Sequence, residues 1–256
     1  MGAVFAATLF SATAGTFNLG LAGGKYAIFT LGGGMKDDDA TGQANIYGDI
    51  GAAGNGDIDL GGSAIVHGDV YYHTPGTLKY KGRAQITGMA YQDPATDAKL
   101  NQGVIDANNA SNFAFAQTTT PAYASTTKID SSMTITGAGQ VVLKLTDFNL
   151  DKTDTLTLNG APGTTFIFNI THNFAMHGSS QIVLGPGIDP NDVLFNVRGT
   201  GGDVVIDGKA KFRGILMANM RNAKLDGDSV SYGEVIANHL DIKHNAIIKR
   251  PGVVSE

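Results

Sequence analysis

Apolar and polar positions alternate in short segments along most of the chain, and glycine bounds each segment. Three copies align without gaps, Gly42–Ile50, Gly62–Val70 and Gly82–Ala90, and the same frame returns at Gly208–Leu216 and Gly227–Val235, with a weaker copy at His244–Arg250. In most copies every second position holds a small or aliphatic residue, which is typical of a strand with one buried face. The pattern predicts a series of short β-strands.

The glycines that bound these segments recur at steps of 20 residues in the first half and 19 in the second. The structural repeat consists of Gly42, Gly48, Gly62, Gly68, Gly82, Gly88, Gly208, Gly214, Gly227 and Gly233. Glycine suits strand ends where φ is positive or where two backbones approach too closely for a Cβ. About 20 residues is too short for the helical repeats of about 33 or more residues or for propeller blades of about 40. We therefore expect an all-β-dominated fold, a parallel, right-handed, triangular β-solenoid with three strands per coil.

The segment 93–117 breaks the alternation and has apolar residues at helical spacing. Asp93 before Pro94 is a favourable N-cap followed by proline at the first helical position. We predict one flanking α-helix here, interrupted or weakened near Gly103. Strands are expected again at 141–150, 154–160, 164–170, 180–185, 193–197 and 203–208, so that the solenoid resumes and runs to the C-terminus. The charged last strand, Leu240–Arg250, is expected to cover a terminal coil against edge pairing.

The first fifteen residues combine an apolar run with a small-residue pattern at Ala12–Ala14, which resembles the end of a secretory signal peptide. We expect a truncated signal over 1–15 and a single β-solenoid domain over 16–256. The alternative, a core strand at the N-terminus, stays open because no Lys or Arg precedes Lys25.

Composition narrows the classes of function. The 256 residues contain no Cys, which excludes disulfides, thiol catalysis and Cys-ligated metals. A net charge of -5 without a basic run gives no attraction to nucleic acid, and no apolar stretch approaches the ~20 residues of a membrane span. We expect neither partner.

Threonine provides the candidate surface-binding residues: Thr134, Thr136, Thr155 and Thr157. The two Thr-x-Thr pairs are 21 residues apart, about one coil, so Thr134 is expected beside Thr155 and Thr136 beside Thr157. Ile135 and Leu156 then point inward. Such short hydroxyl ladders suit ordered water, although β-propensity alone also places threonine in strands.

Other polar groups have less specific patterns. Six His form the pairs 67/73, 172/177 and 239/244, which we interpret as exposed or corner residues. The acidic run 37–39 and the loop 54–59 could offer carboxylates to Ca²⁺, but solvated turns are the preferred interpretation. A further cluster of carboxylates could line a glycan cleft: Asp203, Asp207, Asp226 and Asp228, with Arg213 and Arg221 nearby. Most of its members flank corner glycines, where Asp is common in turns. We therefore predict no catalytic residues, no metal and no cofactor.

The segments 141–150, 154–170, 192–197, 212–218 and 233–237 resemble the choice-of-anchor A domain of secreted bacterial proteins, which is related in layout to the bacterial ice-binding-like β-solenoids. The resemblance covers roughly residues 20–250, but Leu216–Asn219 has Met-Ala where many relatives have Ala-Pro. It implies a non-enzymatic, secreted or cell-surface module with a structural or adhesive role, whose partner is an extracellular surface or a glycan. The alternative is ice binding by the threonine face, and a third hypothesis is a polysaccharide-degrading β-helix enzyme. Oligomeric state and ligand stay open.

Overall fold

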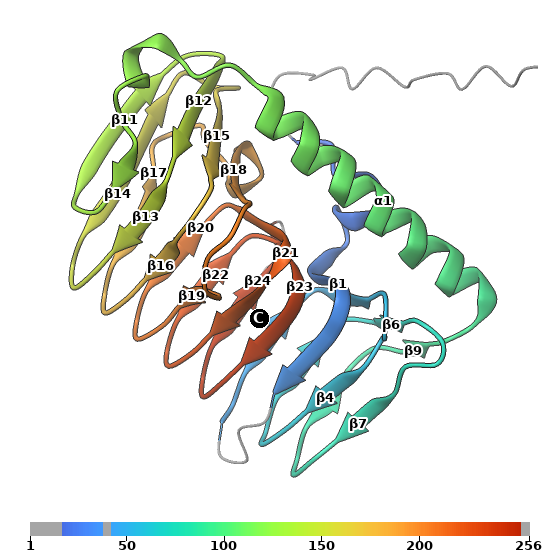
Figure 1. Cartoon of the computed structure of the whole chain (residues 1–256). Helices are drawn as coiled ribbons and strands as arrows, with labels where there is room; N and C mark the ends of the chain where they lie inside the picture. Colours follow the sequence, from blue (N-terminus) through green and yellow to red (C-terminus); the bar gives the residue numbers. More distant parts are fainter. Residues whose placement is uncertain (1–16, 38–41, 252–256) are drawn as a thin grey trace, which may run out of the picture.

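A computed structural model describes residues 17–37 and 42–251. Parallel strands stack into a solenoid of triangular coils, and one long helix lies along its side (Figure 1). The predicted parallel β-solenoid with one flanking helix is therefore confirmed. The predicted signal segment, 1–15, lies outside the described residues.

The register of the strands defines three faces, and three long strands turn a corner and contribute to two of them. Face 1 contains β12 (Gln140–Leu145), β15 (Thr165–Ile170), β18 (Val193–Val197), the first halves of β21 (Ile215–Leu225), β23 (Val235–Ile242) and β1 (Tyr26–Asp37), then β3 (Asp49–Ala52), β6 (Val70–Tyr72) and β9 (Ala90–Tyr91). Face 2 contains β10 (Lys128–Ile129), β13 (Asp147–Leu150), β16 (Phe174–Met176), β19 (Val204–Ile206), the second halves of β21, β23 and β1, then β4 (Ile58–Leu60) and β7 (Leu78–Tyr80). Face 3 contains β11 (Met133–Gly137), β14 (Thr155–Gly160), β17 (Gln181–Leu184), β20 (Lys211–Arg213), β22 (Val230–Tyr232), β24 (Ile247–Lys249), β2 (Asn45–Tyr47), β5 (Ile65–His67) and β8 (Gln85–Ile86). Short 3-10 turns occupy Gly20–Ala22, Pro121–Tyr123 and Pro190–Asp192.

The spatial order of the coils differs from their order in the sequence. The strands after the helix start at the far end of the stack and return toward the first coils, so that β23 pairs with β1 and β24 pairs with β2. Figure 1 accordingly shows β23 and β24 in the middle of the stack. The prediction that Leu240–Arg250 covers a terminal coil is wrong, because β24 has hydrogen-bonded neighbours on both sides, β22 and β2. We call this junction between the two halves of the chain the splice.

The interior is filled by stacked apolar side chains. Inward positions such as Ile135 and Leu156 are fully buried, as predicted. In the half that follows the helix, phenylalanine rings pack on one another, and the rings of Phe168 and Phe195 are parallel with centroids 4.6 Å apart. Offset stacking of this kind adds to the burial of each ring.

The repeat glycines occupy the corners, for the two reasons that the sequence suggests. At Gly227 the backbone has φ 70°, a left-handed conformation that L side chains rarely adopt. At Gly68 a Cβ would lie 2.5 Å from the carbonyl oxygen of Gly48 in the neighbouring coil. His244 occupies the slot of Gly227 in the weaker copy and has φ 57°, so that the conformation persists without glycine.

Helix α1 (Pro94–Ala116) lies within the predicted range, and the carboxylate of its N-cap, Asp93, accepts hydrogen bonds from the backbone N–H groups of Ala95 and Thr96. The predicted interruption near Gly103 is wrong, because the helix is continuous. Gly103 has a packing role instead: a Cβ there would lie 2.6 Å from Cζ of Phe29 on face 1. The glycine lets the helix approach the sheet closely.

The helix spans face 1 from one end to the other. Its 23 residues extend about 34 Å, close to the roughly 38 Å that the nine strands of this face cover. Buried side-chain amides connect the two layers: Asn196 Nδ2 donates to Ser111 O (3.0 Å) and to Asn169 Oδ1 (2.7 Å), and Asn169 Nδ2 donates to Ala114 O (2.7 Å). These bonds satisfy polar groups that would otherwise be costly to bury.

A buried carboxyl group lies at the splice. Glu234, which is 4 % exposed, accepts a hydrogen bond from the backbone N–H of Gly24 (2.8 Å). Arg250 donates to the carbonyl of the same glycine. Burial raises the pKa of Glu234 to about 7, although the Gly24 bond and the Arg250 charge oppose the rise.

Glu234→Gln is expected to change how stability depends on pH. A raised native pKa means that the native state holds a proton that the unfolded chain has released between about pH 4.5 and 7, so the free energy of unfolding falls as pH rises through this window. The full loss is up to about 3 kcal/mol. Urea unfolding of both proteins at pH 5 and pH 8 measures it. Equal pH dependence in wild type and variant would contradict the prediction, and histidine titration cancels in the comparison.

Candidate functional site

Two of the three solenoid faces are open to a ligand. Face 1 packs against α1, with Val142, Ile167 and Leu194 buried beneath the helix. The outward side chains of faces 2 and 3 are exposed or half-buried. The candidate site therefore lies on one of these two faces.

The four predicted threonines lie together on face 3, on the adjacent strands β11 and β14, with their side chains outward. Their predicted pairing is wrong, because Thr134 lies beside Thr157 and Thr136 lies beside Asn159. Thr155 lies instead beside Gln181, whose Nε2 is 3.4 Å from its Oγ1. The coil from Thr134 to Thr157 is longer than the 21 residues of the sequence spacing, which shifts the register by one outward position. A single in-register threonine pair remains.

These threonines belong to a larger uncharged surface on the first three strands of face 3. We call it the threonine patch: Ser132, Thr134, Thr136, Thr155, Thr157, Asn159, Gln181 and Val183. Its outward groups are hydroxyls, amides and one valine, in rows at the strand spacing of ~4.8 Å. The patch ends where Lys211 pairs with Gln181.

The outer edge of the patch is fixed by a side chain from the connecting segment. The hydroxyl of Tyr123 donates to Thr136 O (2.8 Å) and accepts from Thr136 N–H (2.8 Å). It thus occupies the place of a neighbouring strand on the edge of β11. This bonding holds the outermost row of the patch in an extended geometry.

The rest of face 3 has a different surface, a row of alternating cations and aromatic rings across the splice. Arg213 lies over the ring of Tyr232 (5.0 Å), Lys249 lies over the ring of Tyr47 (5.1 Å), and the rings of Tyr47 and His67 stack at 4.4 Å. This row was not predicted from the sequence, although all five residues occupy one position of the repeat, directly before its second glycine or, in the copy with Lys249, before Arg250. Ring faces are covered by cations or by other rings, so the row stabilises the stack.

Face 2 is charged, and histidine–aspartate pairs define it. The pairs are His172–Asp147 (2.8 Å), His177–Asp207 (2.8 Å), His239–Asp241 (3.0 Å) and His244–Asp226 (2.5 Å). The bond from His172 lowers the pKa of Asp147. Burial alone would raise the pKa of Asp226, but hydrogen bonds from Lys224 and His244 outweigh this effect and lower the pKa to about 2. The interpretation of these histidines as exposed or corner residues agrees with their places.

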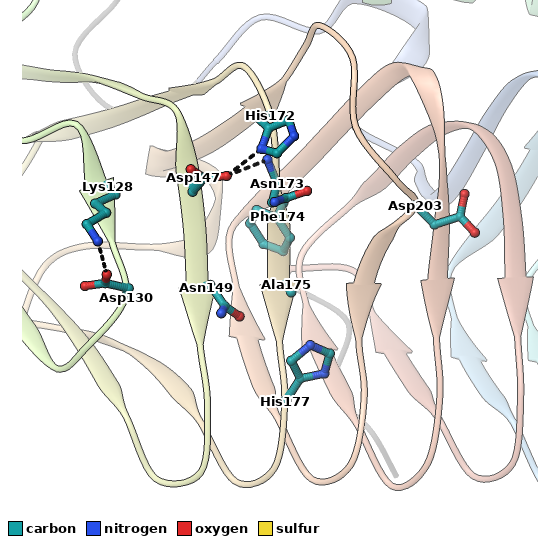
Figure 2. Close-up of a pocket in the computed structure, with 10 residues that line it drawn as sticks. All are labelled: Lys128, Asp130, Asp147, Asn149, His172, Asn173, Phe174, Ala175, His177 and Asp203. Atoms are coloured by element: carbon teal, nitrogen blue, oxygen red, sulfur yellow. Dashed lines mark hydrogen bonds and ion pairs between the residues drawn. The ribbon is translucent and has the colours of Figure 1, made fainter.

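A polar hollow of about 430 Å³ lies on face 2 near the first coils after the helix. Figure 2 shows its lining, with Lys128 bonded to Asp130 on one side and His172 bonded to Asp147 on another. The small side chain of Ala175 leaves space between Asn149 and the histidines. Carboxylates and amides of this kind can hydrogen-bond hydroxyl groups of a ligand.

The predicted glycan cleft does not assemble as a catalytic cluster. Asp203 lies at the hollow, whereas Asp226 pairs with Lys224 and His244. Arg213 is on face 3, and Arg221 donates to the backbone carbonyls of His172 and Gly202. The absence of catalysis stays a prediction.

The two acidic segments considered for Ca²⁺ are neighbours, because β1 pairs with β4 on face 2. Asp57 accepts two hydrogen bonds from Thr77, which lower its pKa, and Asp59 pairs with Lys81 (3.6 Å). Asp38 and Asp39 lie outside the described residues. No group of three or more metal-ligating side chains occurs within 17–37 and 42–251.

The fold and its open faces define a class: parallel β-solenoids with a spliced coil order and one helix-covered face. Solved structures share this fold. A glycosylated ice-binding protein from an Arctic yeast has a TM-score of 0.65 at 19 % identity, covering 95 % of this chain and 96 % of its own. An ice-binding protein from the Antarctic ascomycete Antarctomyces psychrotrophicus has 0.61 at 19 % identity, with 94 % and 100 % covered. The ice-binding protein domain of Shewanella frigidimarina has 0.58 at 19 % identity, with 91 % and 96 % covered.

The family model described as ice-binding-like matches residues 38–248, and the chain belongs to this family. A search of the curated proteins finds no match. The resemblance to the choice-of-anchor A domain stays a prediction. Within the described part of the chain, no helix has the length and apolar character needed to cross a membrane.

Tyr123→Phe is expected to loosen the edge of the threonine patch, because it removes both hydrogen bonds to Thr136. Loss of such a bond costs about 1 kcal/mol. Amide hydrogen exchange at Thr136 measures the effect, which should be faster in the variant. Tyr232→Phe, on the same face, is the control and should leave this exchange unchanged. Equal protection of Thr136 in all three proteins would contradict the role assigned to Tyr123.

Proposed function

We propose that the protein binds ice through the threonine patch. The observation that carries this proposal is the uncharged, regular surface of β11, β14 and β17, with Thr134 and Thr157 in register, in a chain of the ice-binding-like family. Face 1 is occupied by the helix, and ion pairs cover much of face 2. The threonine patch contains no charged side chain.

Ordered water at the threonine patch is the physical basis of the proposed binding. Hydroxyls and amides on adjacent strands repeat at ~4.8 Å, and a rigid parallel sheet holds this spacing without further loss of entropy on binding. Waters that bridge such groups bind nearly as well as direct partners. A charged side chain orders water in a shell around itself, which interrupts a regular water layer. An uncharged patch therefore favours a continuous water lattice.

The site of action forms part of the same proposal. Ice forms outside the cell, so we propose that the protein is secreted or displayed at the cell surface. The apolar N-terminal segment supports export through its resemblance to a signal peptide.

Thr157→Tyr is expected to abolish most ice-binding activity, because a large ring at the centre of the patch lifts an ice surface away from the neighbouring hydroxyls. Thermal hysteresis and ice-crystal shape measure the effect, with circular dichroism as a check of folding. Thr87→Tyr is the matched control, since Thr87 is exposed at the same repeat position at the far end of face 3. Round, unshaped crystals from the wild type would reject ice binding, and an active Thr157→Tyr protein would reject the patch.

The hollow on face 2 favours a second candidate, an adhesive module that binds glycan hydroxyls. Ala175→Trp should fill the hollow and remove glycan binding, measured on an array of polysaccharides. Val183→Trp on face 3 is the control. An array on which the wild type binds nothing would reject this candidate.

A further inference from the structure

The two ends of the solenoid differ in how they are covered. At the end formed by β10 and β11, the inward side chains of Ile129 and Ile135 are only 2 % and 0 % exposed. Tyr123 packs against the core there and bonds the edge of β11. The segment before β10 therefore covers this end.

The opposite end is open. Its last coil consists of β7, β8 and β9, and within the described residues each pairs with a strand on one side only (Figure 1). Tyr80 is 51 % exposed, although its register partner Leu60 in the previous coil is fully buried. Leu78 and Ile86 also occupy inward positions and are half-buried. Core positions and strand edges are thus both presented to solvent.

The open end is basic within an acidic protein. Between Val70 and Gln92 the charged residues are Lys79, Lys81 and Arg83, without any acid, whereas the whole chain has a net charge of -5. Asp59 of the previous coil pairs with Lys81, and Asp69 accepts a hydrogen bond from the backbone N–H of Met89. Charges alternate along the central row of face 2, through Lys224, Asp241, Lys36, Asp59 and Lys79. The row ends on Lys79, so the next strand in this pattern would present an acidic side chain.

We infer that the open end docks an extended segment of a partner protein in which apolar and acidic residues alternate. The segment adds as a strand to the free edge of β7, its apolar side chains cover Leu78 and Tyr80, and its acids face Lys79. Added strands gain main-chain hydrogen bonds, and side chains on alternate positions give specificity.

A second copy of the chain fits this end less well. If two copies of the chain met through their open ends, the three cations of one copy would face the three cations of the other and repel them. Stacking an open end on the covered end is obstructed by Tyr123 and its segment. The inference does not depend on ice binding.

The experiment uses the full chain and two synthetic decapeptides, one with alternating Val and Glu and one with alternating Val and Lys, followed by isothermal titration calorimetry. We expect the acidic peptide to bind and the basic one not to bind. Lys79→Glu/Arg83→Glu should weaken binding of the acidic peptide by about tenfold or more, because it reverses two of the three positive charges of the last coil. Tyr80→Ser should weaken it through lost apolar contact. Lys144→Glu/Lys211→Glu changes two exposed cations elsewhere and is the matched control.

Three results would overturn the inference: no binding of the acidic peptide, equal binding of both peptides, or equal loss in the control variant. Sedimentation velocity tests the other occupant. A wild-type dimer that Tyr80→Ser dissociates would show that the end pairs with a second copy instead. Ice-crystal shaping by Lys79→Glu/Arg83→Glu and by Tyr80→Ser should match the wild type, which separates this test from the threonine patch.

Discussion

Parallel, in-register pairing between coils is the constraint on which the rest of the structure depends. Each coil satisfies the backbone hydrogen bonds of its neighbour, so the molecule needs a continuous ladder from one end to the other. The chain maintains that ladder even though its two halves meet at the splice, where β23 and β24 pair with β1 and β2. The corner glycines, the stacked phenylalanines and the alternating row on face 3 all follow from the same spacing, since they place like positions of successive coils in contact.

Local features of the fold could be predicted from the sequence. The strand period, the corner glycines and the Asp93 N-cap depend on neighbours in the chain, and each left a clear pattern. The splice could not be predicted this way, because β24 and β2 belong to opposite ends of the sequence. One sequence pattern is consistent with this pairing: the copy of the repeat that starts at His244 has the same spacing as the copy that starts at Gly42.

The candidate site was predicted in part. Outward threonines on adjacent strands followed from the alternation, but their register depended on corner lengths that vary in the second half of the chain. Thr134 therefore meets Thr157, and Thr155 meets Gln181. The hollow on face 2 left no signal, because it arises from a small residue, Ala175, between longer side chains of other coils. A surface that is built from several coils can be predicted only when the register between their strands is known. The outward positions of a single strand can be predicted without it.

The splice also has a consequence for how the chain acquires its fold during synthesis. Ile28 pairs with Val235, and more than 200 residues separate them, so the contact order of the central ladder is high. Contacts this distant in sequence close slowly. While the ribosome is still making the second half, β1 has only β3 and β4 beside it, and its other edge stays exposed. The nascent N-terminal coils thus depend on the last strands to be synthesised, which makes truncated products of this chain prone to aggregation.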